Sequence, residues 1–204
     1  MESVLDRVIK QNTENVNLLK TKDYNIFSVL QIQSKEVLIC RMIADLLNPR
    51  GQHGAGAEYL KIFLRDCLGM EKMDTKLADQ AIVTAEYAID DERRIDIVIE
   101  IGSYFLPIEV KIYAADQKSQ CFDYYQYAKR RDAQAKVYYL TLDGHRPGKD
   151  STSSSNRSVP EEDIVCLSFR VHILNWLKAC KSCENTGMVP ILEQFIQNIE
   201  QISG

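Results

Sequence analysis

Charged residues interrupt two apolar runs in the middle of the chain. The run LPIEVKIYAADQ holds Glu109 and Lys111 two positions apart. Because side chains alternate between the two faces of a strand, these two share one face, and the Ile and Val residues around them share the other. In the preceding run, RRIDIVIEI, Arg94 and Asp96 lie opposite to Ile95 and the isoleucines that follow it. Both strands would therefore carry charged groups on one face.

The dipeptide Gly102-Ser103 separates the two runs and suits a two-residue β-hairpin turn. Counting outward from that turn pairs Asp96 with Glu109, whose Cβ atoms would lie about 4.5–5.5 Å apart. Two opposed carboxylates repel each other unless a cation lies between them. Asp and Glu oxygens suit a hard divalent ion such as Mg²⁺, which can activate water and neutralise charge on a phosphate. We therefore expect a metal site, with Lys111 placed to orient the attacking water or to stabilise the developing charge.

The alternative is that these are ordinary charged residues on a solvent-facing strand, with Asp96 paired to an arginine. Each residue taken singly favours that interpretation. Taken together, they favour a functional site, because two carboxylates and a lysine would share one face of two strands that a hairpin turn joins.

Length and composition indicate one globular domain, residues 1–204. The chain has 204 residues, of which 45% are hydrophobic and 26% charged, enough for one well-packed core. No apolar run is long enough for a membrane span, and the first twenty residues are charged throughout, so we expect a cytoplasmic protein without a secretory signal. The net charge of −4 argues against a surface coated with basic residues but allows a local basic patch.

The six cysteines are scattered, mostly in apolar surroundings, and a chain of this size needs no disulfides. We expect reduced thiols in the core. Cys180 and Cys183 form a CxxC pair, but with no second pair and no nearby histidine, helix packing is favoured over zinc binding or redox chemistry.

The period of the apolar residues changes along the chain. Alternation rich in Ile and Val predicts three consecutive strands, and helical spacing predicts helices before and after them. We expect a mixed sheet flanked by helices, an α/β (α+β) fold with the core order αβββαβ. The expected helices lie within residues 1–20, 34–49, 51–69, 116–131, 170–181 and 189–203, and the expected strands within 80–89, 93–101, 104–112, 136–142 and 163–169.

Two local signals refine this outline. Ser34 is placed to cap the second helix, and Pro49 to stop it. Residues 143–160, DGHRPGKDSTSSSNRSVP, are turn formers and serines without periodicity. We expect a mobile or functional loop there, and it is the stretch where disorder is most expected.

The spaced acids and lysine resemble the signature of the PD-(D/E)XK nuclease superfamily: Asp96, twelve residues, then Glu109-Val110-Lys111. The short motif occurs by chance in many chains, but its position on two adjacent strands followed by a helix makes it more specific. Ile95 stands where the signature has proline, which the superfamily commonly tolerates. The resemblance implies a restriction-endonuclease-like core in which Asp96, Glu109 and the Val110 carbonyl bind Mg²⁺ or Mn²⁺ and Lys111 is catalytic.

The helix after the third strand carries Gln117, Gln120 and Tyr124 at i, i+3 and i+7, on one face that would look toward the metal site. The stretch QCFDY resembles the QxxxY element of RecB-like nucleases, which implies contact with the substrate or organisation of the site. An exposed amphipathic helix is the alternative.

Residues 24–64 resemble the N-terminal segment of a bacterial branch of this superfamily, with its E…LL(D/N)P…HG…FL pattern. Glu36 matches the helical glutamate that helps to hold the metal, although the helix dipole favours an acid in any first turn. His53 matches the histidine of the branch, which implies a phosphate-binding or structural role.

Together these resemblances imply a metal-dependent nuclease that hydrolyses phosphodiester bonds in DNA. The alternatives are an inactive relative that keeps the fold as a nucleic-acid or protein-binding module, and a helical adaptor that binds no divalent ion. A basic helix end is favoured by the helix dipole in any case, but such residues can also contact phosphates. The basic residues near the expected site are Arg93, Arg94, Lys118, Lys129, Arg130 and Arg131.

Overall fold

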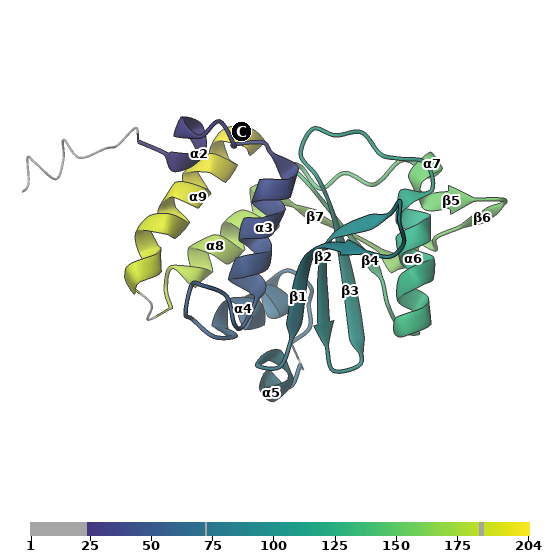
Figure 1. Cartoon of the computed structure of the whole chain (residues 1–204), viewed down its shortest axis with the longest axis horizontal. Helices are drawn as coiled ribbons and strands as arrows, with labels where there is room; N and C mark the ends of the chain where they lie inside the picture. The colour runs from purple at the N-terminus through teal and green to yellow at the C-terminus, as the bar shows by residue number, and fades with distance from the viewer. Residues whose placement is uncertain (1–23, 72, 184–185) are drawn as a thin grey trace, which may run out of the picture.

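A mixed five-stranded sheet forms the middle of the molecule (Figure 1). The structure is a computed structural model that describes residues 24–71, 73–183 and 186–204, so the helix expected over residues 1–20 lies outside the described residues. The strands are β1 Ile82–Ala88, β2 Arg94–Ile101, β3 Tyr104–Lys111, β4 Val137–Thr141 and β7 Ile164–Ser168. Their order is β1-β2-β3-β4-β7, antiparallel from β1 to β3 and parallel from β3 to β7.

Helices cover both sides of this sheet (Figure 1). They are α2 Ile26–Val29, α3 Glu36–Leu47, α4 Glu58–Asp66, α5 Thr75–Ala78, α6 Gln120–Arg131, α7 Lys149–Thr152, α8 Leu174–Cys180 and α9 Val189–Ser203. α3, α4, α8 and α9 lie together on one side, and α6 and α7 lie on the other. None of the described helices is long and apolar enough to cross a membrane. The predicted α+β fold with a mixed sheet flanked by helices is confirmed.

Two hydrophobic cores lie on the two faces of the sheet. The larger core packs α3, α4, α8 and α9 against the sheet, with Tyr59, Trp176 and Phe195 fully buried. The Trp176 indole donates a hydrogen bond to the Tyr59 carbonyl at 2.8 Å, which ties α8 to α4. The smaller core packs α6 against the other face around Phe122 and Tyr139. The charged side chains of β3, Glu109 and Lys111, are therefore cut off from water, which is costly without a partner.

The faces of β1 and β2 switch near Asp96, so the expectation that Ile95 shares a face with the later isoleucines is wrong. Ile97 packs into the larger core, whereas Ile95 packs into the smaller one. At the switch, Glu86 on β1 has a φ of +54°, in the left-handed region. The β1–β2 register pairs the residues on either side of it but leaves out Glu86 and Asp96. Asp96 therefore lies at a local break in the sheet.

A two-residue turn sets the register of β2 against β3, as the sequence predicts. β2 ends at Ile101, β3 begins at Tyr104, and these two residues pair directly. Gly102 in the turn has a φ of +58°, a conformation that glycine adopts without strain because it has no Cβ. The pairing continues to Ile97 and Ile108. The turn therefore brings the start of one strand beside the end of the next.

α3 begins without a side-chain cap, and the expectation that Ser34 caps it is wrong. The residue before the helix is Lys35, which makes no capping hydrogen bond. Glu36, in the first turn, instead bonds to main-chain amides just beyond β3. A contact with a distant part of the chain thus takes the place of a local cap.

α6 begins at Gln120, four residues later than expected, so Gln117 lies before the helix and not on it. Ser119 has a φ of +56°, which breaks the helical path. Its amide donates to the Asp150 carbonyl at 2.7 Å and its hydroxyl to the Ser153 carbonyl at 2.8 Å. These bonds to a distant segment hold Ser119 in that conformation.

Residues 143–160 contain regular structure, so the expectation of disorder there is wrong, whereas a functional role of the segment stays a prediction. The segment forms α7 and a small antiparallel hairpin of β5 (Ser153–Ser154) and β6 (Arg157–Ser158). The buried hydroxyl of Ser151 accepts a hydrogen bond from the Cys121 amide at 3.3 Å. Contacts with α6 therefore stabilise this segment, and they leave no periodic pattern within it.

Gly51, in the turn after α3, lies where any larger residue would collide. A Cβ there would come within 2.2 Å of the Asp45 carbonyl oxygen and 2.6 Å of the His53 ring. We predict that Gly51→Ala lowers the free energy of unfolding by about 3 kcal/mol, the upper end of the usual cost of overpacking. Urea denaturation of the purified protein measures this loss.

Gly69→Ala is the matched control for this substitution. Gly69 has a φ of +66°, but a Cβ there would meet no atom within 4 Å. Its replacement carries only the cost of the left-handed conformation, about 1–2 kcal/mol. Equal losses in the two variants would contradict a steric origin at Gly51.

Candidate active site

The start of β2 and the end of β3 meet at one end of the sheet and bring Asp96 beside Glu109. The paired ladder between the strands stops at Ile97 and Ile108, so the two acids form the next pair outward. Here the Asp96 carboxylate takes the place of main chain, because its Oδ2 accepts a hydrogen bond from the Val110 amide at 2.8 Å. The carboxylate is thereby fixed against the neighbouring strand.

Glu109 and Lys111 are buried, with exposures of 1% and 8%. The Lys111 ammonium donates a hydrogen bond to Glu109 Oε1. The other oxygen of that carboxylate, Oε2, is buried and has no hydrogen-bond partner among the described residues. A buried polar atom without a partner costs about 1–3 kcal/mol, and more when it is charged. This oxygen therefore marks a place where a positive ligand would be stabilising.

The surroundings raise the pKa of both carboxyl groups. Burial raises the pKa of Asp96, although the hydrogen bond from the Val110 amide partly offsets the rise. Burial raises the pKa of Glu109 well above its usual range, and the Asp96 charge adds to the rise. Burial alone would lower the pKa of Lys111, but the surrounding carboxylates outweigh it and the net change is upward. Two acids thus share one charged lysine, and their excess negative charge favours a further cation.

Glu36 approaches the same end of β3 from the first turn of α3. Its Oε2 accepts hydrogen bonds from the Ile112 amide at 2.6 Å and the Ala114 amide at 3.4 Å. After burial and the nearer groups, its negative charge also contributes to the raised pKa of Asp96. Glu36 therefore lies near the two acids and holds the chain just beyond the strand that carries Glu109.

The acids of β2 and β3 fit a hard divalent ion such as Mg²⁺ or Mn²⁺. Their oxygens are the ligands that such ions prefer, and Oε2 of Glu109 has no competing partner within the described chain. Within residues 24–71, 73–183 and 186–204, no three His, Cys, Asp or Glu side chains are arranged to hold an ion together. Both amide bonds of Glu36 use its Oε2. Glu36 therefore lies near the two acids without forming a three-carboxylate cluster with them in this arrangement.

Gln120 and Tyr124, at the start of α6, pack toward these acids and are 5% and 1% exposed. The Tyr124 hydroxyl donates to the main-chain carbonyl of Arg94, two residues before Asp96. The Gln120 amide donates to the Tyr124 hydroxyl at 3.1 Å. Burial, and then the charge of Glu109, raises the pKa of Tyr124. This face of α6 therefore looks toward the acids.

Gln117 belongs to a polar cluster around Arg93. The Arg93 guanidinium donates to Gln117 Oε1 at 2.8 Å, to Asp123 at 3.1 Å and to the Lys118 carbonyl at 2.6 Å. Arg93 is thus occupied in holding the start of the helix. The side chains of Arg94 and Lys118 are exposed, and neither forms an ion pair with a described residue.

The basic end of α6 is also engaged by the protein itself. Lys129 pairs with Asp163 at 3.2 Å, and Arg131 pairs with a glutamate of β2 at 2.7 Å. The Arg130 guanidinium lies over the Tyr127 ring, 5.3 Å from its centroid. These contacts stabilise the helix end, so the three residues have structural partners before any nucleic acid binds.

Cys40, Tyr139 and Asp116 adjoin the site although no motif marked them. Cys40 lies one turn after Glu36 on α3, and burial, followed by the charges of the site's carboxylates, raises its pKa. Tyr139 on β4 pairs with Glu109 on β3, and its hydroxyl donates to Asp116 at 2.8 Å. Helical spacing from Glu36 could have identified Cys40. The pairing of β4 with β3 left no signal in the sequence.

His53 is a structural residue of the turn between α3 and α4. It is 4% exposed, and its Nδ1 accepts a hydrogen bond from the Ala55 amide at 3.0 Å. Its Nε2 therefore carries the proton, which it donates to the Asn48 carbonyl at 2.9 Å. The ring stacks on Tyr59 with the centroids 4.8 Å apart. Of the two roles predicted for His53, the geometry supports the structural one.

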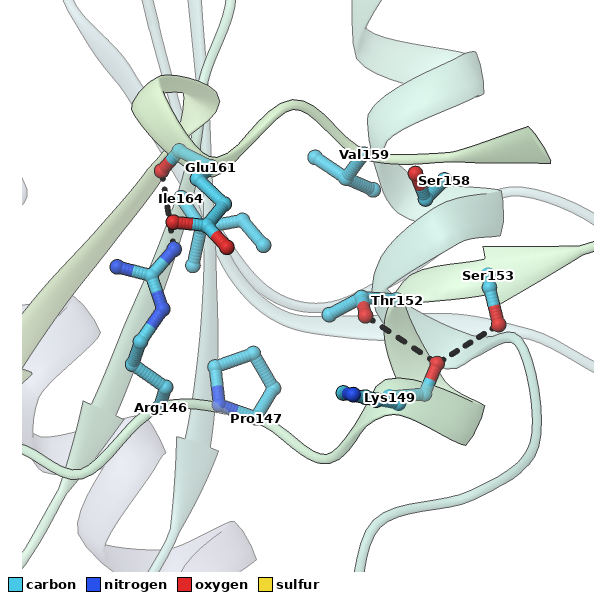
Figure 2. A pocket seen from close by; sticks show the side chains of 9 residues that line it. All are labelled: Arg146, Pro147, Lys149, Thr152, Ser153, Ser158, Val159, Glu161 and Ile164. Atoms are coloured by element: carbon cyan, nitrogen blue, oxygen red, sulfur yellow. Dashed lines mark hydrogen bonds between the residues drawn. The ribbon is translucent and has the colours of Figure 1, made fainter.

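A cavity of about 450 Å³ opens beside residues 146–164, and Figure 2 shows the side chains around it. Arg146 donates to the Glu161 carbonyl at 3.0 Å on one side. On the other side, the hydroxyls of Thr152 and Ser153 donate to the Lys149 carbonyl at 3.2 and 2.7 Å. No residue predicted for the site lines this cavity. The cavity and the predicted site residues therefore occupy separate places in the molecule.

A comparison with protein families agrees with this geometry. The chain matches the family model of the PD-(D/E)XK nuclease superfamily over residues 24–197. It belongs to this superfamily. Comparisons with curated proteins and with solved structures give no match. The superfamily and its restriction-endonuclease-like fold are thus confirmed, whereas the RecB-like branch and its N-terminal pattern stay predictions.

Asp96→Asn keeps an acceptor for the Val110 amide and removes one of two competing charges. Folding raises the pKa of Asp96, so the ionised Asp96 carboxylate is less stable in the folded protein than in the unfolded chain. At neutral pH this charge therefore lowers the free energy of unfolding. We predict that Asp96→Asn raises Tm by a few degrees in EDTA at neutral pH, where about 2–4 °C corresponds to 1 kcal/mol at this chain length. Scanning calorimetry measures the change.

Glu100→Gln, on the same strand, is the control for the loss of a carboxylate. Glu100 forms a surface ion pair with Arg131 at 2.7 Å. Exposed pairs of this kind contribute about 0–1 kcal/mol, so we expect Tm to stay the same or to fall slightly. A Tm that falls in Asp96→Asn as well would contradict the proposed repulsion between the two acids.

Proposed function

We propose that the chain is a metal-dependent nuclease, one domain over residues 1–204, that hydrolyses phosphodiester bonds in DNA. Membership of the PD-(D/E)XK nuclease superfamily supports hydrolysis of nucleic acid. The observation that carries the metal dependence is the buried Oε2 of Glu109, which has no partner in the described chain and lies beside a second acid, Asp96. A divalent ion would give that oxygen a partner and balance the charge of the two acids.

Asp96 and Glu109 would hold the Mg²⁺ or Mn²⁺ ion, with the Val110 carbonyl as a further ligand and Glu36 acting through water. A bound ion of this kind lowers the pKa of a coordinated water and neutralises charge on a phosphate. Glu36 has a second task, because its bonds to the amides beyond β3 keep the end of that strand in place. The acids are therefore positioned before substrate arrives.

Lys111 acts as a charged donor and not as a base. Burial opposes its charge, but the carboxylates around it raise its pKa above the usual value. Its ammonium, held beside Glu109, orients the attacking water or stabilises the negative charge that develops on the phosphate. Because the ammonium is buried and already bonded, its position requires little reorganisation during the reaction.

Gln117, Gln120, Tyr124 and Arg94 form the substrate side of the proposed site. The hydroxyl of Tyr124 fixes the main chain just before the first acid, and Gln120 in turn fixes Tyr124. The exposed side chain of Arg94, together with that of Lys118, provides a cation for the phosphate backbone. In this proposal α6 positions the main chain beside Asp96, whereas the exposed cations attract the phosphate backbone of the nucleic acid.

Cleavage of circular and linear DNA, each with Mg²⁺, Mn²⁺ or EDTA, tests this function directly. Ion-dependent cutting of the circle indicates an endonuclease, and degradation of the linear form alone indicates an exonuclease. The same assay on RNA tests the preference for DNA. If none of these substrates is cut with either ion, the proposal is wrong and an inactive binding module is the better description.

Divalent ions should stabilise the folded protein through Glu109. We predict that millimolar Mn²⁺ raises the Tm of the parent protein over its value in EDTA, since an ion that binds only the native state stabilises it. Glu109→Gln should abolish most of this rise. Differential scanning fluorimetry measures both. Glu58→Gln, an exposed acid of α4, is the control and should keep the rise. A full rise in Glu109→Gln would place the ion elsewhere.

Lys111→Ala should separate catalysis from ion binding. We predict cleavage slower by about 10²-fold or more, the usual effect of losing one donor aimed at transition-state charge. Mn²⁺ binding measured by isothermal titration should persist, because the carboxylates remain. Lys76→Ala removes an exposed lysine from α5 and serves as the control. Cleavage by Lys111→Ala at the parent rate in single-turnover experiments would rule out this role.

A further inference from the structure

Tyr113 follows Lys111 by two residues and is 69% exposed, the highest value among the large hydrophobic side chains of the described chain. Within the described residues, its hydroxyl has no hydrogen-bond partner and its ring no aromatic or cationic neighbour. Ala114 and Ala115, which follow it, are also exposed. Single exposed apolar residues are common on protein surfaces, so exposure alone carries no conclusion. The position of Tyr113 beside the proposed catalytic lysine is what distinguishes it.

The main chain on both sides of Tyr113 is held in place. Oε2 of Glu36 accepts hydrogen bonds from the amides of Ile112 and Ala114, at 2.6 and 3.4 Å. The ring therefore projects from an anchored backbone although the ring itself is not packed. An aromatic side chain held in this way binds a flat partner at a small cost in conformational entropy.

We infer that Tyr113 is a stacking platform for an unpaired nucleobase of the strand being cut, an inference that rests on the proposed function. Two residues of chain span at most about 7 Å. Stacked nucleotides are about 3.4 Å apart along one strand. The base that meets Tyr113 therefore lies within a few nucleotides of the bond near Lys111.

The chemistry of stacking selects the substrate class. An internal base of an intact duplex has both faces covered by its neighbours, whereas a single strand, an overhang or a frayed end leaves a face free. Stacking on an aromatic ring tolerates every base, because each has a π face. The preferred substrate is accordingly DNA with an unpaired stretch at the cleavage site, with little dependence on sequence at the stacked position.

Binding in EDTA, which prevents ion-dependent cleavage, tests the platform. The probes are a fluorescein-labelled single-stranded DNA of twelve nucleotides and a blunt duplex of the same length, followed by anisotropy. Tyr113→Ala should weaken binding of the single strand about 5-fold to 150-fold, the range for losing one stacked base. Tyr113→Phe keeps the ring and should bind within about 2-fold of the parent. Tyr104→Ala removes a 40% exposed tyrosine from the far end of β3 and should have no effect.

Three results would overturn the inference: unchanged single-strand affinity in Tyr113→Ala, an equal loss in Tyr113→Phe, or an equal loss on the blunt duplex. The outcome is separable from that of the proposed function, because binding is measured without metal. If the parent protein cuts DNA but Tyr113→Ala binds the single strand normally, the platform alone is wrong. If Tyr113→Ala loses single-strand binding but the parent cuts nothing, Tyr113 stacks a base of a strand that is bound and not cut, and the nuclease proposal is wrong.

Discussion

Repulsion between two carboxylates inside the sheet is the constraint around which this end of the molecule is organised. The turn at Gly102 sets the register that brings Asp96 beside Glu109. A slip of one residue would separate them, but it would also turn every side chain of the slipped strand to the opposite face of the sheet, away from the core it packs in. The burial of the sheet on both faces therefore maintains a contact that is unfavourable by itself.

The neighbouring elements reduce this repulsion in different ways. Lys111 supplies one positive charge from the same strand, and the Val110 amide supplies a hydrogen bond to the first acid. α6 fixes the main chain beside that acid through Tyr124. None of these contacts reaches Oε2 of Glu109, so one negative atom is left for an ion. This unpartnered oxygen destabilises the metal-free fold, and it is also the atom to which a divalent ion would bind.

Distortion of the backbone accompanies the site. Glu86 adopts a left-handed φ of +54°, and beside it the β1–β2 pairing skips Asp96, so both strands exchange faces at this point. Side-chain carboxylate replaces main chain as the acceptor for Val110. If the β1–β2 pairing were regular here, the side chains of β2 would alternate between the two faces without a break at Asp96. Local departures of this kind occur where a site must aim a side chain away from the regular pattern.

The sequence by itself determined the five strands of the main sheet and the β2–β3 register, because strand alternation and turn chemistry act over a few residues. Only the tertiary structure decided where α6 begins, that residues 143–160 are ordered, and what Glu36 binds. Those outcomes rest on contacts between distant parts of the chain, such as the bond from Ser119 to the Asp150 carbonyl at 2.7 Å. A contact between residues so far apart in the chain produces no periodic pattern in the sequence, because its energy depends on where the fold places both partners.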